Sequence, residues 1–241
     1  MAKAGTSRHS WRSTLMASVT MAVLAMLPHS VAAATTIGQA ADGATCSAGP
    51  GTGMDTVQTA SAGPTYAVPD GSWQVTGWSA QASAAMDSTL QLEIWRPTTT
   101  ADTFTLVGIS SPQTLLMGSG VNTFPLAAPI AVLPRDLLGL RVTGMAGCSS
   151  FTGNFTGDAR RLALGTPSPT PGTTTVFPFL STGFELNVAA TLEASPPVPS
   201  ARPECMDGGW QNLTDDHGVA FTNQGDCVSF VSTDGRNTAR G

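Results

Sequence analysis

The stretch Leu90-Gln-Leu-Glu-Ile-Trp95 predicts a β-strand, because apolar side chains recur along it with a period of two. Successive side chains of a strand point to opposite faces of a sheet. One face, expected to lie on a core, would carry Leu90, Leu92 and Ile94. The opposite face would carry Gln91, Glu93 and Trp95. The segment therefore indicates a half-buried strand of a β-sheet.

Short runs of the same kind recur across residues 42–194, with almost no helical periodicity between them. They are Thr65–Val68, Gln74–Ala82, Thr103–Ser110, Thr123–Val132, Leu137–Thr143, Thr173–Phe179 and Phe184–Leu192. Turn-forming residues separate them, as in Pro69-Asp-Gly71 and Met117-Gly-Ser-Gly120. Many short strands at this spacing predict a mainly β domain, an antiparallel jelly-roll-like sandwich.

Residues 1–33 have the pattern of a signal peptide. Three basic residues precede an apolar run at Leu15–Leu27, and small residues follow at Ser30–Ala34. The apolar run is shorter than the roughly 20 residues that a membrane-spanning helix needs. We therefore expect cleavage after Ala33, no membrane span, and a protein that is secreted or associated with the cell surface.

The exported chain is acidic. Lys3 is the only lysine, so cleavage after Ala33 leaves eight arginines against sixteen acidic residues, a formal charge of −8. Proteins that bind nucleic acid or anionic membranes carry a basic surface instead. The composition therefore argues against nucleic acid as a partner, and an extracellular glycan or a surface protein is the expected kind of partner.

The cysteines indicate two disulfides. Cys46, Cys148, Cys205 and Cys227 form an even set in an exported chain, and none of them belongs to a C-x-x-C pair typical of zinc or redox sites. Four cysteines permit three pairings. A proline-rich segment at residues 195–204 separates the first two from the last two, which favours Cys46–Cys148 and Cys205–Cys227.

The segment 195–204 predicts a semi-rigid linker, because it contains four prolines. The tail module that follows, residues 205–237, is short, and below about 40 residues a chain seldom folds without a covalent staple. The disulfide predicted within it would supply that staple. Asn223 is expected to cap a short helix over Gln224–Thr233, which would end at Gly235.

Two parts of the chain resemble known sequences. Cys205-x-x-Gly-Gly-Trp210, followed by Phe221-x-Asn-Gln-Gly-x-Cys-Val-Ser229, resembles a C-terminal module of secreted actinobacterial proteins. The stretch Tyr66–Val188, which includes Trp95-Arg-Pro97, resembles a β-sandwich-like domain of such proteins. The resemblance covers most of the exported chain and implies no particular activity, cofactor or partner. The insertion Thr214–Gly218 departs from the pattern of the module.

Residues suited to catalysis are sparse. His217 is the only histidine outside the predicted signal peptide, and the sequence has no G-x-S-x-G nucleophile motif, so a serine hydrolase is not expected. A glycosidase needs only two carboxylates. Glu93, beside Gln91 and Trp95, could face a saccharide, on which an exposed indole would stack. The alternative is a Trp95 covered by a neighbouring loop.

The aspartates do not indicate a metal site. A calcium loop gathers several acidic residues within a dozen positions. Aspartates near the predicted strand ends are instead scattered, and aspartate is common in turns because it bonds to nearby backbone. They are Asp42, Asp55, Asp70, Asp87 and Asp102. We expect neither a bound metal nor a cofactor.

Together these features predict a secreted, non-enzymatic protein, an extracellular binding or surface-associated module. Its candidate ligand contacts are Trp95, Glu93 and Gln91. One alternative is a carbohydrate-binding module or weak glycosidase that uses the same three residues. The other is a structural surface component that acts through self-association.

Overall fold

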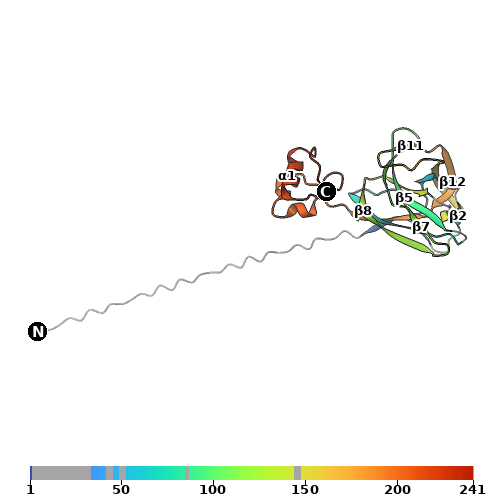
Figure 1. The fold of residues 1–241 in the computed structure, drawn as a ribbon, viewed down its shortest axis with the longest axis horizontal. Helices are drawn as coiled ribbons and strands as arrows, with labels where there is room; N and C mark the ends of the chain where they lie inside the picture. Colours follow the sequence, from blue (N-terminus) through green and yellow to red (C-terminus); the bar gives the residue numbers. More distant parts are fainter. Residues whose placement is uncertain (2–33, 42–45, 49–52, 85–86, 144–147, 241) are drawn as a thin grey trace. The chain divides into compact units, whose positions relative to one another are not determined.

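The computed structural model describes residue 1 and residues 34–41, 46–48, 53–84, 87–143 and 148–240 (Figure 1). The predicted signal peptide falls almost entirely outside these residues. Among the described residues, no helix has the length and apolar character needed to cross a membrane.

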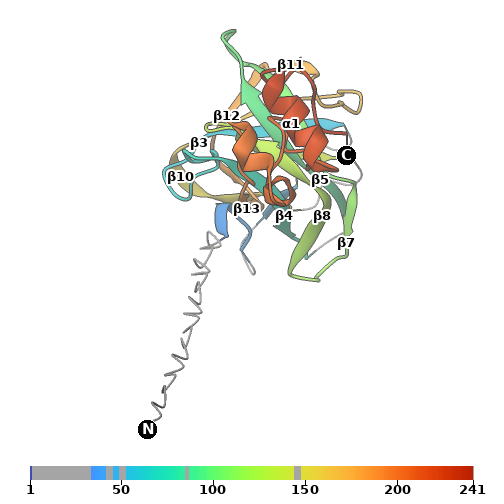
Figure 2. The same cartoon turned by 90° about the vertical axis from the view of Figure 1, so that its left-hand side faces the viewer.

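Two antiparallel sheets carry most of the described chain. The first has four strands in the order β1-β13-β4-β8, and Figure 2 shows β13, β4 and β8 side by side. Their bounds are β1 (Thr35–Gln39), β4 (Trp73–Gln81), β8 (Val121–Val132) and β13 (Val188–Ala194). We call it the four-stranded sheet.

The second sheet has nine strands among the described residues. Seven follow the order β11-β6-β5-β9-β3-β10-β12, while β2 pairs with β10 and β7 pairs with β5. Their bounds are β2 (Cys46–Ala48), β3 (Met54–Ala60), β5 (Ser88–Pro97), β6 (Thr103–Ile109), β7 (Gln113–Leu115), β9 (Leu137–Val142), β10 (Cys148–Ala163), β11 (Thr174–Val176) and β12 (Phe179–Leu186).

The main core lies between the two sheets. Leu90, Leu92 and Ile94 of β5 are buried in one apolar cluster with Val75 and Trp78 of the four-stranded sheet. Side chains from both sheets therefore share one interior, as in a β-sandwich. The predicted fold class, mainly β with antiparallel sheets in a sandwich, is confirmed, and so is the predicted core face of β5.

A second apolar core covers the other face of the nine-stranded sheet. Its centre is Phe177, whose ring meets that of Trp95 edge-on at 4.9 Å between centroids and that of Phe104 at 5.4 Å. The remaining buried members are Val57, Leu106 and Ala163. Phe177 belongs to residues 164–177, here called the strap, which connects β10 to β12 and includes β11. Because of the strap, the nine-stranded sheet is buried on both faces in this region.

Three predicted boundaries are corrected by the structure. The sandwich begins at Thr35 rather than at residue 42, because β1 pairs with β13. Residues 65–68 do not form a strand, and Ala67 makes only an isolated bridge. The predicted strand Phe184–Leu192 is divided at Asn187, where the chain passes from one sheet to the other.

The side chain of Asn187 explains this division. Asn187 is fully buried, and its Nδ2 donates to the carbonyl oxygens of Gln81 at 3.1 Å and Cys148 at 2.7 Å. These acceptors belong to different sheets. A buried amide that bonds backbone in both layers thus fixes the point of crossing.

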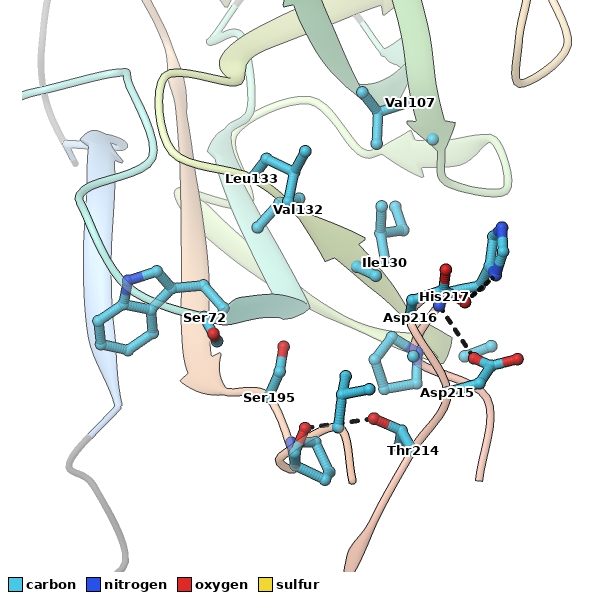
Figure 3. Close-up of a pocket in the computed structure, with 18 of the residues that line it drawn as sticks. Ser72, Val107, Ile130, Val132, Leu133, Ser195, Thr214, Asp215, Asp216 and His217 are labelled. Carbon is cyan, nitrogen blue, oxygen red and sulfur yellow. Dashed lines mark hydrogen bonds and ion pairs between the residues drawn. The ribbon is translucent and has the colours of Figure 1, made fainter. Parts of the chain in front are cut away.

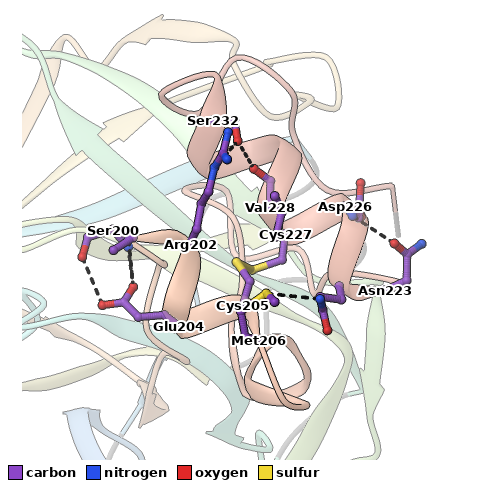
Figure 4. The surroundings of a disulfide bond; sticks show 12 residues. Ser200, Arg202, Glu204, Cys205, Met206, Asn223, Asp226, Cys227, Val228 and Ser232 are labelled. Carbon is purple, nitrogen blue, oxygen red and sulfur yellow. Dashed lines mark hydrogen bonds between the residues drawn. A yellow bond between two sulfur atoms is a disulfide. The ribbon is translucent and has the colours of Figure 1, made fainter.

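The tail confirms the predicted disulfide and helix. Cys205 and Cys227 are bonded, with their Cα atoms 5.7 Å apart (Figure 4). The helix α1 (Gln224–Ser232) begins after Asn223, whose side chain accepts from the Asp226 amide at 2.9 Å. Cys148 is also disulfide-bonded. The side chain of Cys46, its predicted partner, lies outside the described residues.

Gly235 ends the tail helix, and two short 3-10 helices precede it. Gly235 has a φ of +79°, and its amide donates to the carbonyl of Phe230, as expected for a residue that ends a helix. The 3-10 helices η1 (Arg202–Cys205) and η2 (Gly209–Asn212) precede α1. Because η1 starts at Arg202, the tail takes up the last three residues of the predicted linker.

Trp95→Ala is expected to lower the free energy of unfolding by about 3–5 kcal/mol, because the strap cannot fully collapse into the space of a buried indole. Trp73→Ala is the matched control and should cost clearly less, since Trp73 is only half-buried. Urea unfolding followed by circular dichroism measures both. Equal losses for the two variants would contradict the role of Trp95 as the buried centre of this face.

Candidate functional site

The three predicted ligand contacts lie on one face of β5, as expected, but the strap covers them. Trp95 and Glu93 are 0% exposed and Gln91 is 6% exposed. Gln91 donates from Nε2 to the carbonyl of Ser110 at 2.7 Å, and Trp95 donates from Nε1 to Glu93 Oε2 at 2.9 Å. The expectation that Trp95 presents an open ring for stacking is therefore wrong, and the alternative of a covering loop is correct.

A glycine allows Trp95 to reach Glu93. An added Cβ at Gly139 would lie 2.6 Å from Cδ1 of Trp95 and 2.7 Å from the carbonyl oxygen of Thr56. The indole therefore lies directly across the backbone of β9 at Gly139. This close approach turns Nε1 toward the carboxyl of Glu93.

Glu93 is joined by two further ionisable groups from neighbouring strands. In the register of the sheet, Arg141 of β9 lies between Gln91 of β5 and Asp55 of β3, so the side chains share a face. Arg141 Nη1 donates to Asp55 Oδ1, and both residues are buried. We call Asp55, Glu93 and Arg141 the buried charge cluster. Asp55, expected in a turn, instead belongs to this cluster.

With both carboxyls ionised, the buried charge cluster would carry two negative charges and one positive charge. Desolvation raises the pKa of Glu93 well above its ordinary value, and the nearby charge of Asp55 raises this pKa further. The Trp95 N–H and the Arg141 guanidinium oppose that shift. The other carboxyl oxygen of Glu93, Oε1, is buried and has no hydrogen-bond partner among the described residues. The two carboxyls are shut off from solvent, so neither meets a substrate in this conformation.

A separate groove is open to solvent (Figure 3). Its volume is about 680 Å³, and the sandwich, the linker and the tail line it. The sandwich supplies Val107, Ile130 and Leu133, and the linker supplies Ser195–Val198. The tail supplies residues 214–218. No local motif predicts this groove, since its walls come from distant segments; the only signal was the insertion at Thr214–Gly218, which forms part of the wall.

The tail side of the groove is built on a hydrogen-bonded turn. Asp215 is buried, and its Oδ1 accepts from the amides of His217 at 2.9 Å and Val219 at 2.8 Å, while Oδ2 accepts from the amide of Ala239 at 3.1 Å. The exposed His217 pairs through Nδ1 with Asp216 at 2.7 Å. Asp215, Asp216 and His217 lie close enough to hold a metal ion. The oxygens of Asp215 are, however, already used to hold the loop.

No family model, curated protein or solved structure matches the chain. The resemblance of its tail and sandwich to secreted actinobacterial proteins therefore stays a prediction.

Glu93→Gln is expected to flatten the pH dependence of stability. Because the folded pKa of Glu93 is raised above its ordinary value of 4.5, the bound proton stabilises the folded state fully below that value. This contribution is lost as the pH rises through the folded pKa. Between the two pKa values the free energy of unfolding should fall by up to about 1.4 kcal/mol per pH unit in the natural chain.

Urea unfolding between about pH 5 and pH 9 measures this slope. Glu193→Gln is the matched control, since Glu193 is exposed on β13. The slope should decrease in Glu93→Gln and stay unchanged in Glu193→Gln. Equal slopes in all three proteins would show that Glu93 does not carry the proton.

Proposed function

We propose that this chain is an exported, non-enzymatic protein that binds an extracellular glycan through the groove lined by the sandwich, the linker and the tail. The observation that carries the proposal is the groove itself. Its volume of about 680 Å³ lies within the range of about 300–1,000 Å³ that is usual for ligand sites. Export is supported by the signal-like sequence at residues 1–33 and by the disulfide of the tail.

The walls of the groove suit a ligand with apolar and polar faces. Val107, Ile130 and Leu133 offer aliphatic surface, and Trp73 adds an aromatic side chain to the lining. Sugars present such mixed faces, with C–H groups on one side of the ring and hydroxyls around it. The exposed Asp216–His217 pair supplies hydrogen-bonding groups for those hydroxyls.

The charge of Arg96, which also lines the groove, is paired with that of Asp136. Arg96 donates from Nε and Nη2 to the two carboxylate oxygens of Asp136, each at 2.8 Å. A bidentate pair of this kind holds the guanidinium in place. Arg96 therefore shapes the wall, and the groove favours an uncharged ligand over an anionic one.

The alternative of a glycosidase that uses Trp95, Glu93 and Gln91 has less support. These residues are buried under the strap, whereas a glycosidase must bring two carboxyls to a solvent-accessible bond. The groove, in contrast, is open without any change of conformation. We therefore place the binding site at the groove.

Ala128→Trp is expected to abolish ligand binding, because Ala128 is exposed and lines the groove, so an indole there would fill it. Ala127→Trp is the matched control: Ala127 is exposed on the same strand and does not line the groove. Binding is measured on an array of purified oligosaccharides, with calorimetric titration of any that bind. The loss should be at least about tenfold in affinity, or about 1.4 kcal/mol.

Two results would contradict the proposal. Equal affinity of the two tryptophan variants would show that the groove is not the binding site. If the natural chain bound no oligosaccharide on the array, a glycan would be ruled out as the ligand.

A structural, self-associating role is the second candidate, and an edge strand favours it. β12 pairs with β10 on one side and ends the sheet on the other, and the nearby Val176, Phe179 and Leu180 are exposed. An open edge with exposed apolar side chains can pair with a second chain. The edge strand β8, in contrast, contains Pro125 and Pro129, which block such pairing.

Leu180→Lys is expected to shift the chain toward the monomer if β12 mediates self-association, because a charge on an edge strand opposes pairing. Leu116→Lys is the control, since Leu116 is equally exposed outside β12. Sedimentation velocity over a series of concentrations measures both variants. A natural chain that stays monomeric throughout would contradict the self-associating role.

A further inference from the structure

One strap residue, Thr166, connects the strap to the buried charge cluster. Thr166 Oγ1 donates to Asp55 Oδ2 at 2.6 Å and accepts from Arg141 Nη1 at 3.1 Å. Arg141 Nη2 donates to the Thr166 carbonyl at 3.0 Å. The amide of Thr166 also donates to the carbonyl of Gly53 at 3.0 Å. Thr166 Oγ1 is also within hydrogen-bonding distance of that carbonyl, at 3.0 Å. The first part of the strap is thus held both by the charged groups of the cluster and by the backbone of Gly53.

The second part of the strap is held differently. β11 pairs with β6, the amide of Gly172 donates to the Leu106 carbonyl at 2.8 Å, and the amide of Phe177 donates to the Asp102 carbonyl at 2.7 Å. Arg161 pairs with Asp102 at 2.6 Å beside this end. These contacts do not involve the buried charge cluster. The strap therefore has a charge-dependent half, residues 164–171, and a charge-independent half, residues 172–177.

The charged groups around Glu93 balance only if one carboxyl of the cluster carries a proton. Asp55 faces it from β3 and Arg141 faces it from β9. β6 and the strap contain no titratable residue. The nearby pairs Arg96–Asp136 and Arg161–Asp102 are each balanced within themselves. Two carboxyls and one guanidinium are neutral only when one carboxyl is protonated, and an uncompensated buried charge is strongly unfavourable.

We propose that the buried charge cluster holds one proton, on Glu93, and that this proton is a latch which keeps Thr166, and with it residues 164–171 of the strap, bonded to Asp55 and Arg141. When the proton is lost, two adjacent buried carboxylates repel each other and require water. Release of Thr166 from Asp55 and Arg141 would let water reach them. Opening would expose the buried charge cluster to solvent, Phe177 would stay in contact with Trp95, and protonation would close the strap again.

Two observations agree with this latch. The pKa of Glu93 is raised by its burial and by the charge of Asp55, which is the direction that a retained proton requires. Residues 164–171 also contain Pro167, Pro169 and Pro171, which have no amide hydrogen to bond to the sheet. With few backbone bonds of its own, this half of the strap depends on Thr166.

Hydrogen exchange followed by mass spectrometry tests the latch on the full exported chain. After correction for the intrinsic rate at each pH, exchange within residues 164–171 should rise by up to about tenfold per pH unit between the ordinary pKa of Glu93 and its raised folded pKa, and level off above it. Exchange within residues 172–177 and within β4 should not follow it. In Glu93→Gln the rise should be absent, and Glu193→Gln should behave as the natural chain does.

A further variant distinguishes the latch from a general loss of protection against exchange. Thr166→Val keeps the size of the side chain and removes its hydroxyl, so exchange of residues 164–171 should be raised at every pH. Asp55→Asn replaces Glu93→Gln if the latter does not fold, and should also remove the pH response. The latch is overturned if the natural chain and the Gln variant respond alike, or if β4 opens together with the strap.

Discussion

Trp95 holds the outer part of the sandwich together, because its ring and its N–H group act on different partners. The ring packs edge-on against Phe177 of the strap, and Nε1 donates to Glu93 at 2.9 Å. An indole combines a large apolar surface with a single donor. One side chain therefore closes the second core and also gives a buried carboxyl a partner. Without that cover, β3, β5 and β9 would expose to solvent the face that carries the buried charge cluster.

The elements that could be predicted are those decided by neighbouring residues. The alternation in Leu90–Trp95 correctly assigned both faces of β5, because burial follows the period of a strand. Asn223 and Gly235 correctly marked the ends of α1, because helix caps are made within a few residues. The side of the sheet on which Trp95 lies was predictable as well. A covering loop was one of the two alternatives for Trp95, but the residue that covers it was not predictable, because Phe177 is distant in the sequence.

The elements that could not be predicted contain polar side chains whose partners lie on other strands. In β3, Asp55 and Gln58 interrupt the apolar pattern, yet both are buried. Asp55 bonds to Arg141, and Gln58 accepts from the amide of Leu186 at 3.0 Å. In β10 the buried Arg160 has the same effect on the pattern. Such contacts depend on the order of the strands, and so does the groove. For this reason the candidate site was not visible in any single stretch of residues.

Gly139 sets a limit on how this sheet can vary. A methyl group at that position would contact both the backbone of β3 and the indole of Trp95. A displaced indole would move its N–H away from Glu93 and its ring away from Phe177. One added carbon would therefore disturb both the buried charge cluster and the strap. The large apolar residues nearby, such as Leu138 and Leu140, can be exchanged for others of similar volume with modest cost. The least replaceable position on this strand is thus the one that has no side chain.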